Sequence, residues 1–149
     1  MHQSLRQDDA ARRRWCLGLA IALPFVVTAR AEGRTLRVGS GERFRTLLDA
    51  VKAAGSGDVI EVQPGAYHGD VAVVAVPRLT IRGLGSGAVF HADGAHAEGK
   101  AILVVRGDVV VENLEFRGAR VPAGNGAGIR FESGRLGVRR CRFFDNEMG

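Results

Sequence analysis

The chain has 149 residues, with 21 Lys and Arg against 16 Asp and Glu, and this length suits a single domain. Residues 1–31 carry five arginines and two aspartates, a net of +3, which leaves 16 basic and 14 acidic residues, a net of +2, for residues 32–149. This near balance argues against a dedicated nucleic-acid binder, which concentrates basic residues on one face. It leaves room for an acidic ligand, such as a uronate polymer or phosphate, bound by arginine.

The first 31 residues have the layout of a secretory signal peptide. A basic segment, Arg12-Arg13-Arg14, precedes an apolar run over residues 15–28, and Ala29-Arg30-Ala31 offers a small-x-small cleavage site. The run is shorter than the roughly 20 residues that a membrane anchor needs, and Pro24 interrupts it. We predict a signal peptide at 1–31 and a mature domain at 32–149 that is periplasmic or secreted, with no membrane contact after cleavage. An uncleaved anchor is the alternative, and the sequence leaves ordinary and twin-arginine export open.

One helix is predicted near the start of the mature domain. Apolar residues there recur at the spacing of a single helical face: Phe44, Leu47, Leu48, Val51 and Ala54. Gly55 follows, where a left-handed C-terminal cap is expected.

After Gly57 the sequence alternates β-rich segments with glycine-rich turns. The predicted strands are residues 58–62, 71–76, 79–82, 88–91, 101–105, 109–116, 127–132 and 136–144. Turns are expected between them, among others at Pro64-Gly65, Gly107-Asp108 and Ser133-Gly134. No helix-length pattern separates the strands, which excludes a doubly wound sheet with its crossover helices.

A degenerate repeat of 27 residues runs through the second half. Residues 101–106 align with 128–132, and residues 111–116 align with 138–143. A period between about 20 and 50 residues without a helix indicates a β-solenoid, in which each repeat forms one coil and equivalent strands stack in parallel. The residues predicted to point inward are Val109, Val111 and Leu114 in one coil and Leu136, Val138 and Cys141 in the next. Cys141 is the only cysteine after residue 31 and is interpreted as a small core residue.

Three segments carry a family resemblance: Gly57-Asp58-Val59-Ile60-Glu61-Val62-Gln63-Pro64-Gly65-Ala66-Tyr67, Leu79-Thr80-Ile81-Arg82-Gly83 and Arg142-Phe143-Phe144-Asp145-Asn146-Glu147. The first two resemble the N-terminal entry of the pectin-lyase-like superfamily, and the third resembles the β-helix repeats of that group. The resemblance covers about residues 36–149. It implies an all-β fold, a right-handed parallel β-helix of about three coils with an N-terminal amphipathic capping helix.

The resemblance implies a spread of functions. Its members include lyases, hydrolases and epimerases of acidic polysaccharides, phage tailspikes and non-catalytic periplasmic helpers. We expect an exported β-helix that binds or processes an acidic polysaccharide, with the catalytic coils largely missing from this chain. The alternatives are a non-catalytic binding or assembly β-helix and a truncated fragment without function. Self-association through the uncapped C-terminal coil is a further expectation.

Outward arginines are the first candidates for ligand binding. Strand positions 82, 106, 130, 139 and 142 all hold arginine among apolar residues, and a solvated face of paired charges is the simpler interpretation. If a groove for carboxylates exists, Arg106 and Arg130 are the first candidates, because they fall close together in the 27-residue repeat. Tyr67 either packs at the edge of the first coil or stacks on a sugar.

Two other patterns carry less weight. His91, Asp93 and His96 could ligate a divalent ion, but their glycine-rich surroundings favour a solvated turn, so no metal is predicted. Residues 83–87 are similar to a phosphate-binding turn but lack the helix that should follow it. No cofactor is predicted.

Overall fold

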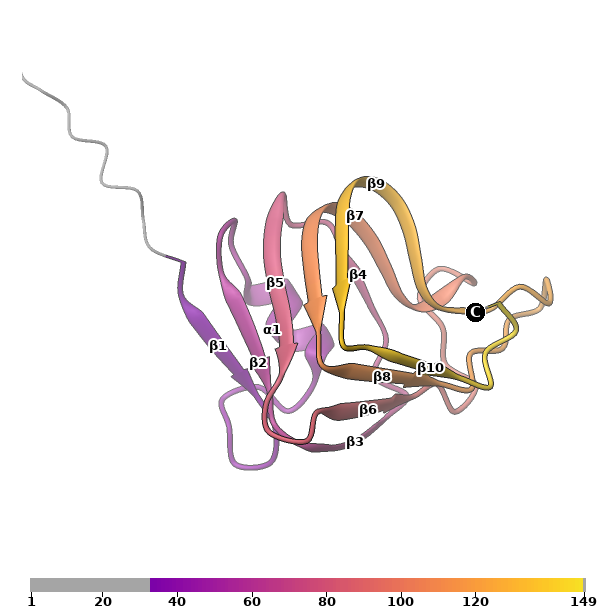
Figure 1. Cartoon of the computed structure of the whole chain (residues 1–149), viewed down its shortest axis with the longest axis horizontal. Helices are drawn as coiled ribbons and strands as arrows, with labels where there is room; N and C mark the ends of the chain where they lie inside the picture. The colour runs from indigo at the N-terminus through magenta and orange to yellow at the C-terminus, as the bar shows by residue number, and fades with distance from the viewer. Residues whose placement is uncertain (1–32, 149) are drawn as a thin grey trace, which may run out of the picture. The chain divides into compact units, whose positions relative to one another are not determined.

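The computed structural model describes residues 33–148, so the predicted signal peptide lies outside the described residues. The fold is a mostly β parallel β-solenoid of about four turns with one short helix (Figure 1). The predicted parallel β-helix is therefore confirmed, with about four turns where about three were expected. No helix within residues 33–148 is long and apolar enough to cross a membrane.

Each full turn has three strand-bearing faces. The first turn contains β1 (Thr35–Val38) and α1 (Leu47–Ala53), and the second contains β2 (Val59–Val62), β3 (Gly65–His68) and β4 (Ala72–Val74). The remaining turns are built from β5 (Arg78–Gly83), β6 (Ala88–His91), β7 (Ala101–Glu112), β8 (Leu114–Arg117), β9 (Ala127–Arg139) and β10 (Arg142–Phe144). All strand pairs are parallel, as the repeat predicted.

The strands stack into three columns, which we call face A, face B and face C. Face A is β1, β2, β5 and the second halves of β7 and β9. Face B is β3, β6, β8 and β10. Face C is β4 with the first halves of β7 and β9. The strands β7 and β9 therefore bend from face C to face A. Gly107 and Gly134, at the two predicted turns, stand at this bend with positive φ, but each strand continues through the bend and does not end there.

The repeat length changes at this bend. Beyond it Val111 pairs with Val138, which confirms the offset of 27. Before it Ala101 pairs with Ala127, an offset of 26, and a register shift between Val105 and Arg106 absorbs the extra residue. The predicted alignment of residues 101–106 is therefore wrong by one position, because a β-bulge inserts a residue into one strand only.

The helix is shorter than predicted. Thr46 caps its start by accepting a hydrogen bond from the Asp49 backbone N–H at 3.1 Å. Phe44 lies before the helix and pairs with Val38 instead. At the other end Ala54 is extended, and Gly55 lies outside the left-handed region, so the predicted glycine cap is wrong.

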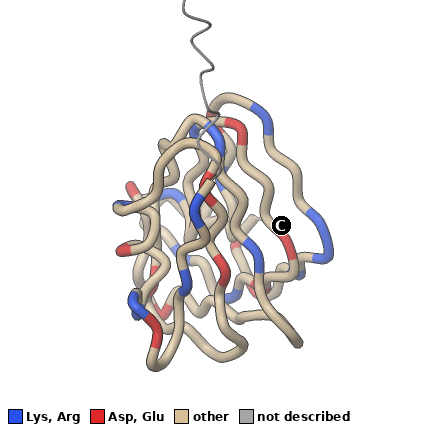
Figure 2. The backbone as a smooth tube through the Cα atoms, turned by 90° about the vertical axis from the view of Figure 1, so that its left-hand side faces the viewer, with Lys and Arg blue, Asp and Glu red and all other residues tan. Residues whose placement is uncertain are grey.

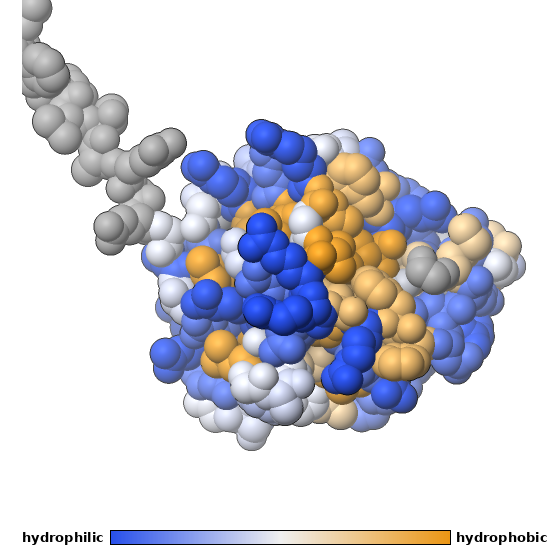
Figure 3. Space-filling view, viewed as in Figure 1, coloured by the Kyte–Doolittle hydropathy of each residue, from blue (hydrophilic) through white to orange (hydrophobic). Residues whose placement is uncertain are grey.

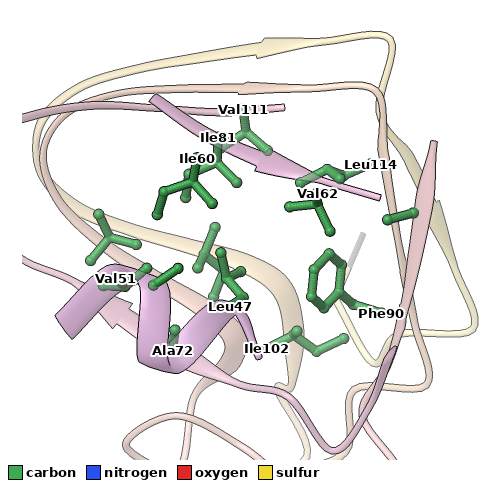
Figure 4. Packing of buried hydrophobic residues seen from close by; sticks show 14 of the residues in the cluster. Leu47, Val51, Ile60, Val62, Ala72, Ile81, Phe90, Ile102, Val111 and Leu114 are labelled. Carbon is green, nitrogen blue, oxygen red and sulfur yellow. The ribbon is translucent and has the colours of Figure 1, made fainter. Parts of the chain in front are cut away.

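Apolar residues fill the solenoid in stacked rows. Leu36, Ile60, Ile81 and Val111 occupy one row of face A and are buried. Leu47 and Val51 of α1 point toward this row (Figure 4). Face B contributes a stack of aromatic rings whose successive centroids are 5.1, 5.8 and 5.5 Å apart: Tyr67, Phe90, Phe116 and Phe143. Such pairs add about 0.5–1.5 kcal/mol each beyond their burial.

Candidate functional site

A pocket of about 360 Å³ lies where the loop before α1 meets β3. Its polar lining combines hydroxyl, guanidinium, imidazole and carboxylate groups: Ser40, Arg45, Thr46, Tyr67, His68 and Asp70. We call this the first-turn pocket. A concave site with several convergent polar groups is the usual form of a small-ligand site.

His68 is held in place by a carboxylate from the next turn. It stands at the end of β3, pairs in register with His91 of β6, and stacks on that ring with centroids 4.8 Å apart. Its Nδ1 lies 2.6 Å from Oδ2 of Asp93. A carboxylate accepts a hydrogen bond from an imidazole N–H, so this contact suits the tautomer of His68 with its proton on Nδ1 and with Nε2 as an acceptor. A carboxylate that orients an imidazole in this way is a recurrent partner of a general base.

Arg45 brings positive charge to the same pocket. Its side chain is exposed and lies directly before the N-cap of α1. None of the ion pairs among residues 33–148 includes Arg45. A guanidinium without an internal carboxylate partner is suited to bind the carboxylate of a ligand.

Asp70 also lines the pocket, but its carboxylate already accepts hydrogen bonds from the backbone of α1. Its carboxylate accepts the backbone N–H of Leu47 at 2.5 Å and of Leu48 at 3.1 Å, and the residue is buried. Burial raises the pKa of Asp70 above its ordinary value, and these two hydrogen bonds oppose the rise only in part. Asp70 thus ties α1 to the second turn and satisfies the first N–H groups of the helix.

Tyr67 is the first ring of the aromatic stack. Its ring lies on Phe90, and its hydroxyl donates to the carbonyl of Gln63 at 2.9 Å. Burial raises the pKa of the Tyr67 hydroxyl, which therefore keeps its proton. These contacts are those of a residue packed at the edge of a coil, one of the two roles expected for Tyr67. The residue also lines the pocket, so sugar stacking stays a prediction.

Arg106 and Arg130 lie away from the pocket and do not share a row. Arg106 pairs in register with Ser133, and Arg130 pairs with Val104 on face C. Arg106 donates to Glu132 at 2.6 Å and to Glu98 at 3.0 Å, and these carboxylates raise the pKa of its guanidinium. Its binding capacity is thus taken up within the chain. The Nε of Arg130 is buried without a hydrogen-bond partner. Ligand binding by either arginine stays a prediction.

The three candidate metal ligands separate in the structure. Asp93 bonds to His68, and Nδ1 of His96 accepts the backbone N–H of Gly99 at 3.1 Å. No group of three His, Cys, Asp or Glu residues within the described part of the chain is placed to hold a metal ion.

Sequence reasoning missed His68 because β3 was interpreted as a turn. Its neighbours Pro64 and Gly65 are typical of turns, and the strand is defined by its pairing with β6. The spacing of 23 residues between His68 and His91 was the available signal, since residues one turn apart stack.

Comparisons of the chain with protein-family models, with curated proteins and with solved structures found no match. The fold therefore defines the class of the protein, a parallel β-solenoid, and no family is assigned.

Proposed function

We propose that this protein is an exported β-solenoid of the pectin-lyase-like kind that binds an acidic polysaccharide in the first-turn pocket and abstracts a proton from it. The signal-like leader supports export, and the solenoid fold supports the class only by analogy. The observation that carries the proposal is the pair of groups in one pocket: Arg45 as a cation, and His68 held by Asp93 as a base.

The chemistry that fits these groups is β-elimination from a uronate. Arg45 binds the carboxylate and stabilises the negative charge that develops next to it. Nε2 of His68 accepts the C5 proton, which leaves an enolate. The C4–O glycosidic bond then breaks and a C4=C5 double bond forms. The departing oxygen takes a proton from water, and the hydroxide that remains takes the proton from the imidazolium of His68. Delivery of a proton from water to the opposite face of C5 would give epimerisation instead, with the imidazolium of His68 losing its proton to the hydroxide.

Binding without catalysis is the second candidate. The side chains of His68 and Asp93 are 62% and 53% exposed, so the pocket excludes little water from them. Catalysis gains strength from water exclusion, which favours a binding role if the pocket stays open with its ligand.

Two variants separate these roles. Calorimetric titration with oligogalacturonate and oligoalginate should show about tenfold to hundredfold weaker binding for Arg45→Gln, as the loss of a charged hydrogen bond implies. His68→Gln should retain binding and lose the ultraviolet absorbance of the unsaturated product. His96→Gln is the matched control, because His96 is exposed and does not line the pocket. Equal binding of a neutral glucan, or no effect of Arg45→Gln, would reject the proposal.

A further inference from the structure

The outward side chains of face A form a ladder of alternating charge. One row of the sheet reads, in register from β1 to β9, Arg37, Glu61, Arg82, Glu112 and Arg139. Glu61 lies 3.5 Å from Arg37 and 2.6 Å from Arg82, and Arg139 lies 3.3 Å from Glu112. Basic and acidic positions are interspersed along the chain in Figure 2. Solvated ion pairs therefore complete the outward side of face A, as is usual for a sheet face exposed to water.

The outward side of face C is apolar instead. Ala72 and Val74 of β4 are buried in the core, so Val73 between them lies on the outward side of the strand. Val73 and the neighbouring Val71 pack there against a second cluster of buried residues: Ala97, Ala101, Val104 and Ala127. Val104 is fully buried, whereas Val71 and Val73 are only half-buried. The part of face C next to α1 is therefore apolar surface that the fold covers incompletely.

A groove of about 370 Å³ runs along this part of face C, and we call it the α1–β4 groove. Leu48, Val51 and Lys52 of α1 form one wall. The other wall is β4 with the residues on either side of it, which include Val71 and Val76, and Ala97 closes one side. Lys52 is the single charged residue among the described residues that line the groove. The volume lies within the range of small-ligand sites, which are mostly apolar with a few polar groups that orient the ligand.

The α1–β4 groove is separate from the apolar surface of the last turn. Figure 3 shows that surface beside the chain end, where β9 and β10 expose Phe131, Val138 and Phe143. The groove belongs to the first two turns, and β7 pairs with β4 and stands between it and β9. The exposure of the groove therefore does not depend on the last turn.

Lys52 supplies a cation at the rim of the groove. It stands in the last turn of α1 and is exposed, and none of the ion pairs among residues 33–148 includes it. A lysine stem lies along apolar surface while its ammonium group stays at the water boundary. An apolar tail in the groove would thus end beside a positive charge that has no carboxylate partner in the described part of the chain.

We propose that the α1–β4 groove binds a single-chain amphiphile with a carboxylate head, the chemistry of a fatty acid. The tail packs against Leu48, Val71 and Val73 and removes their apolar surface from water, which supplies affinity. The carboxylate accepts a hydrogen bond from the ammonium group of Lys52, which favours an anion over a neutral molecule with the same tail.

Titration of the full chain with octanoate and with octanol, followed by NMR of labelled leucine and valine methyl groups, tests this proposal. Octanoate should shift the methyl signals of Leu48, Val71 and Val73, and octanol should bind about threefold to tenfold more weakly. Lys52→Gln should reduce the affinity for octanoate to that for octanol. Arg43→Gln is the matched control, because it removes an exposed charge outside the groove and should change neither affinity.

The apolar wall has its own pair of variants. Val73→Thr keeps the shape of the side chain and should weaken octanoate and octanol alike, whereas Val89→Thr, at a half-buried valine of face B, should weaken neither. Methyl shifts confined to the last turn, equal affinity for the two ligands, or no effect of Lys52→Gln would overturn the proposal. Groove signals that move with protein concentration alone would identify a second copy as the occupant and would overturn it too. The groove shares no residue with the first-turn pocket, so this test is independent of the sugar-binding proposal.

Discussion

Two residues that occupy equivalent corners of successive turns show how single positions set local stability. Asn113 and Arg140, one repeat of 27 residues apart, both have positive φ, 54° and 51°. Asn113 uses the corner, since its Nδ2 donates to the carbonyls of Gly83 at 2.9 Å and Gly85 at 3.2 Å. Asparagine tolerates this conformation better than arginine does.

Arg140→Asn should therefore raise the free energy of unfolding by about 1 kcal/mol, because it relieves backbone strain and restores a short amide at the corner. Asn113→Ala should lower it by about 1–3 kcal/mol, because two carbonyls lose their donor. Urea denaturation measures both changes. Asn113→Gly accepts the same φ without the amide and should show most of the alanine loss; a glycine variant as stable as the wild type would mean that the hydrogen bonds contribute little.

Helices and strands could be predicted from the sequence where neighbouring residues determine them, and they were missed where contacts distant in sequence determine them. Strand β6 has the predicted bounds, because an apolar run stands between glycine turns. The start of α1 depends on Asp70, which is distant in sequence and accepts from its first two N–H groups. Strand β3 depends on its pairing with β6, and the bulge at Glu132 of β9 depends on its pairing with β7. Periodicity in one sequence does not encode such contacts.

The junction between α1 and β2 should show a defined pH dependence. The Asp58 carboxylate accepts a hydrogen bond from the backbone N–H of Gly55 at 2.8 Å and another from that of Arg34 at 2.7 Å. These hydrogen bonds lower the pKa of Asp58 although burial opposes them, and the bond from Gly55 has the largest effect. A lowered folded-state pKa stabilises the fold above the ordinary value of 3.8, and this contribution disappears as pH falls through the folded-state value.

Asp58→Asn should accordingly be less stable than the wild type by about 1 kcal/mol at neutral pH. The gap in the free energy of unfolding should close below pH 3.8, as the wild-type carboxyl becomes protonated. Denaturant titrations at several pH values measure it. A difference in the free energy of unfolding that stays constant down to acidic pH would show that the asparagine amide fits the site poorly, and that the charge of Asp58 contributes little.

At the scale of the whole molecule, each turn contacts only its neighbours, so position along the stack determines how much each turn contributes. The repeat in the sequence predicted the parallel stack, but the columns of opposite charge and of aromatic rings appear only when the register is known. The pair of His68 and Asp93 at the pocket could not be predicted for the same reason. These residues are 25 positions apart in the sequence and meet because they lie in adjacent turns. Arg106 and Arg130, close in the predicted repeat, are out of register, because Arg130 pairs with Val104 and Arg106 pairs with Ser133.

The aromatic stack makes this dependence on position measurable. Phe116 lies between Phe90 and Phe143 and is fully buried, so Phe116→Ala should lower the free energy of unfolding by about 3–5 kcal/mol. Phe143 ends the stack and is 36% exposed, and its alanine variant should lose less than half as much, because water replaces a smaller contact. Hydrogen exchange should likewise be slower in β6 than in β10. Equal losses for the two variants would mean that the last turn is covered in solution.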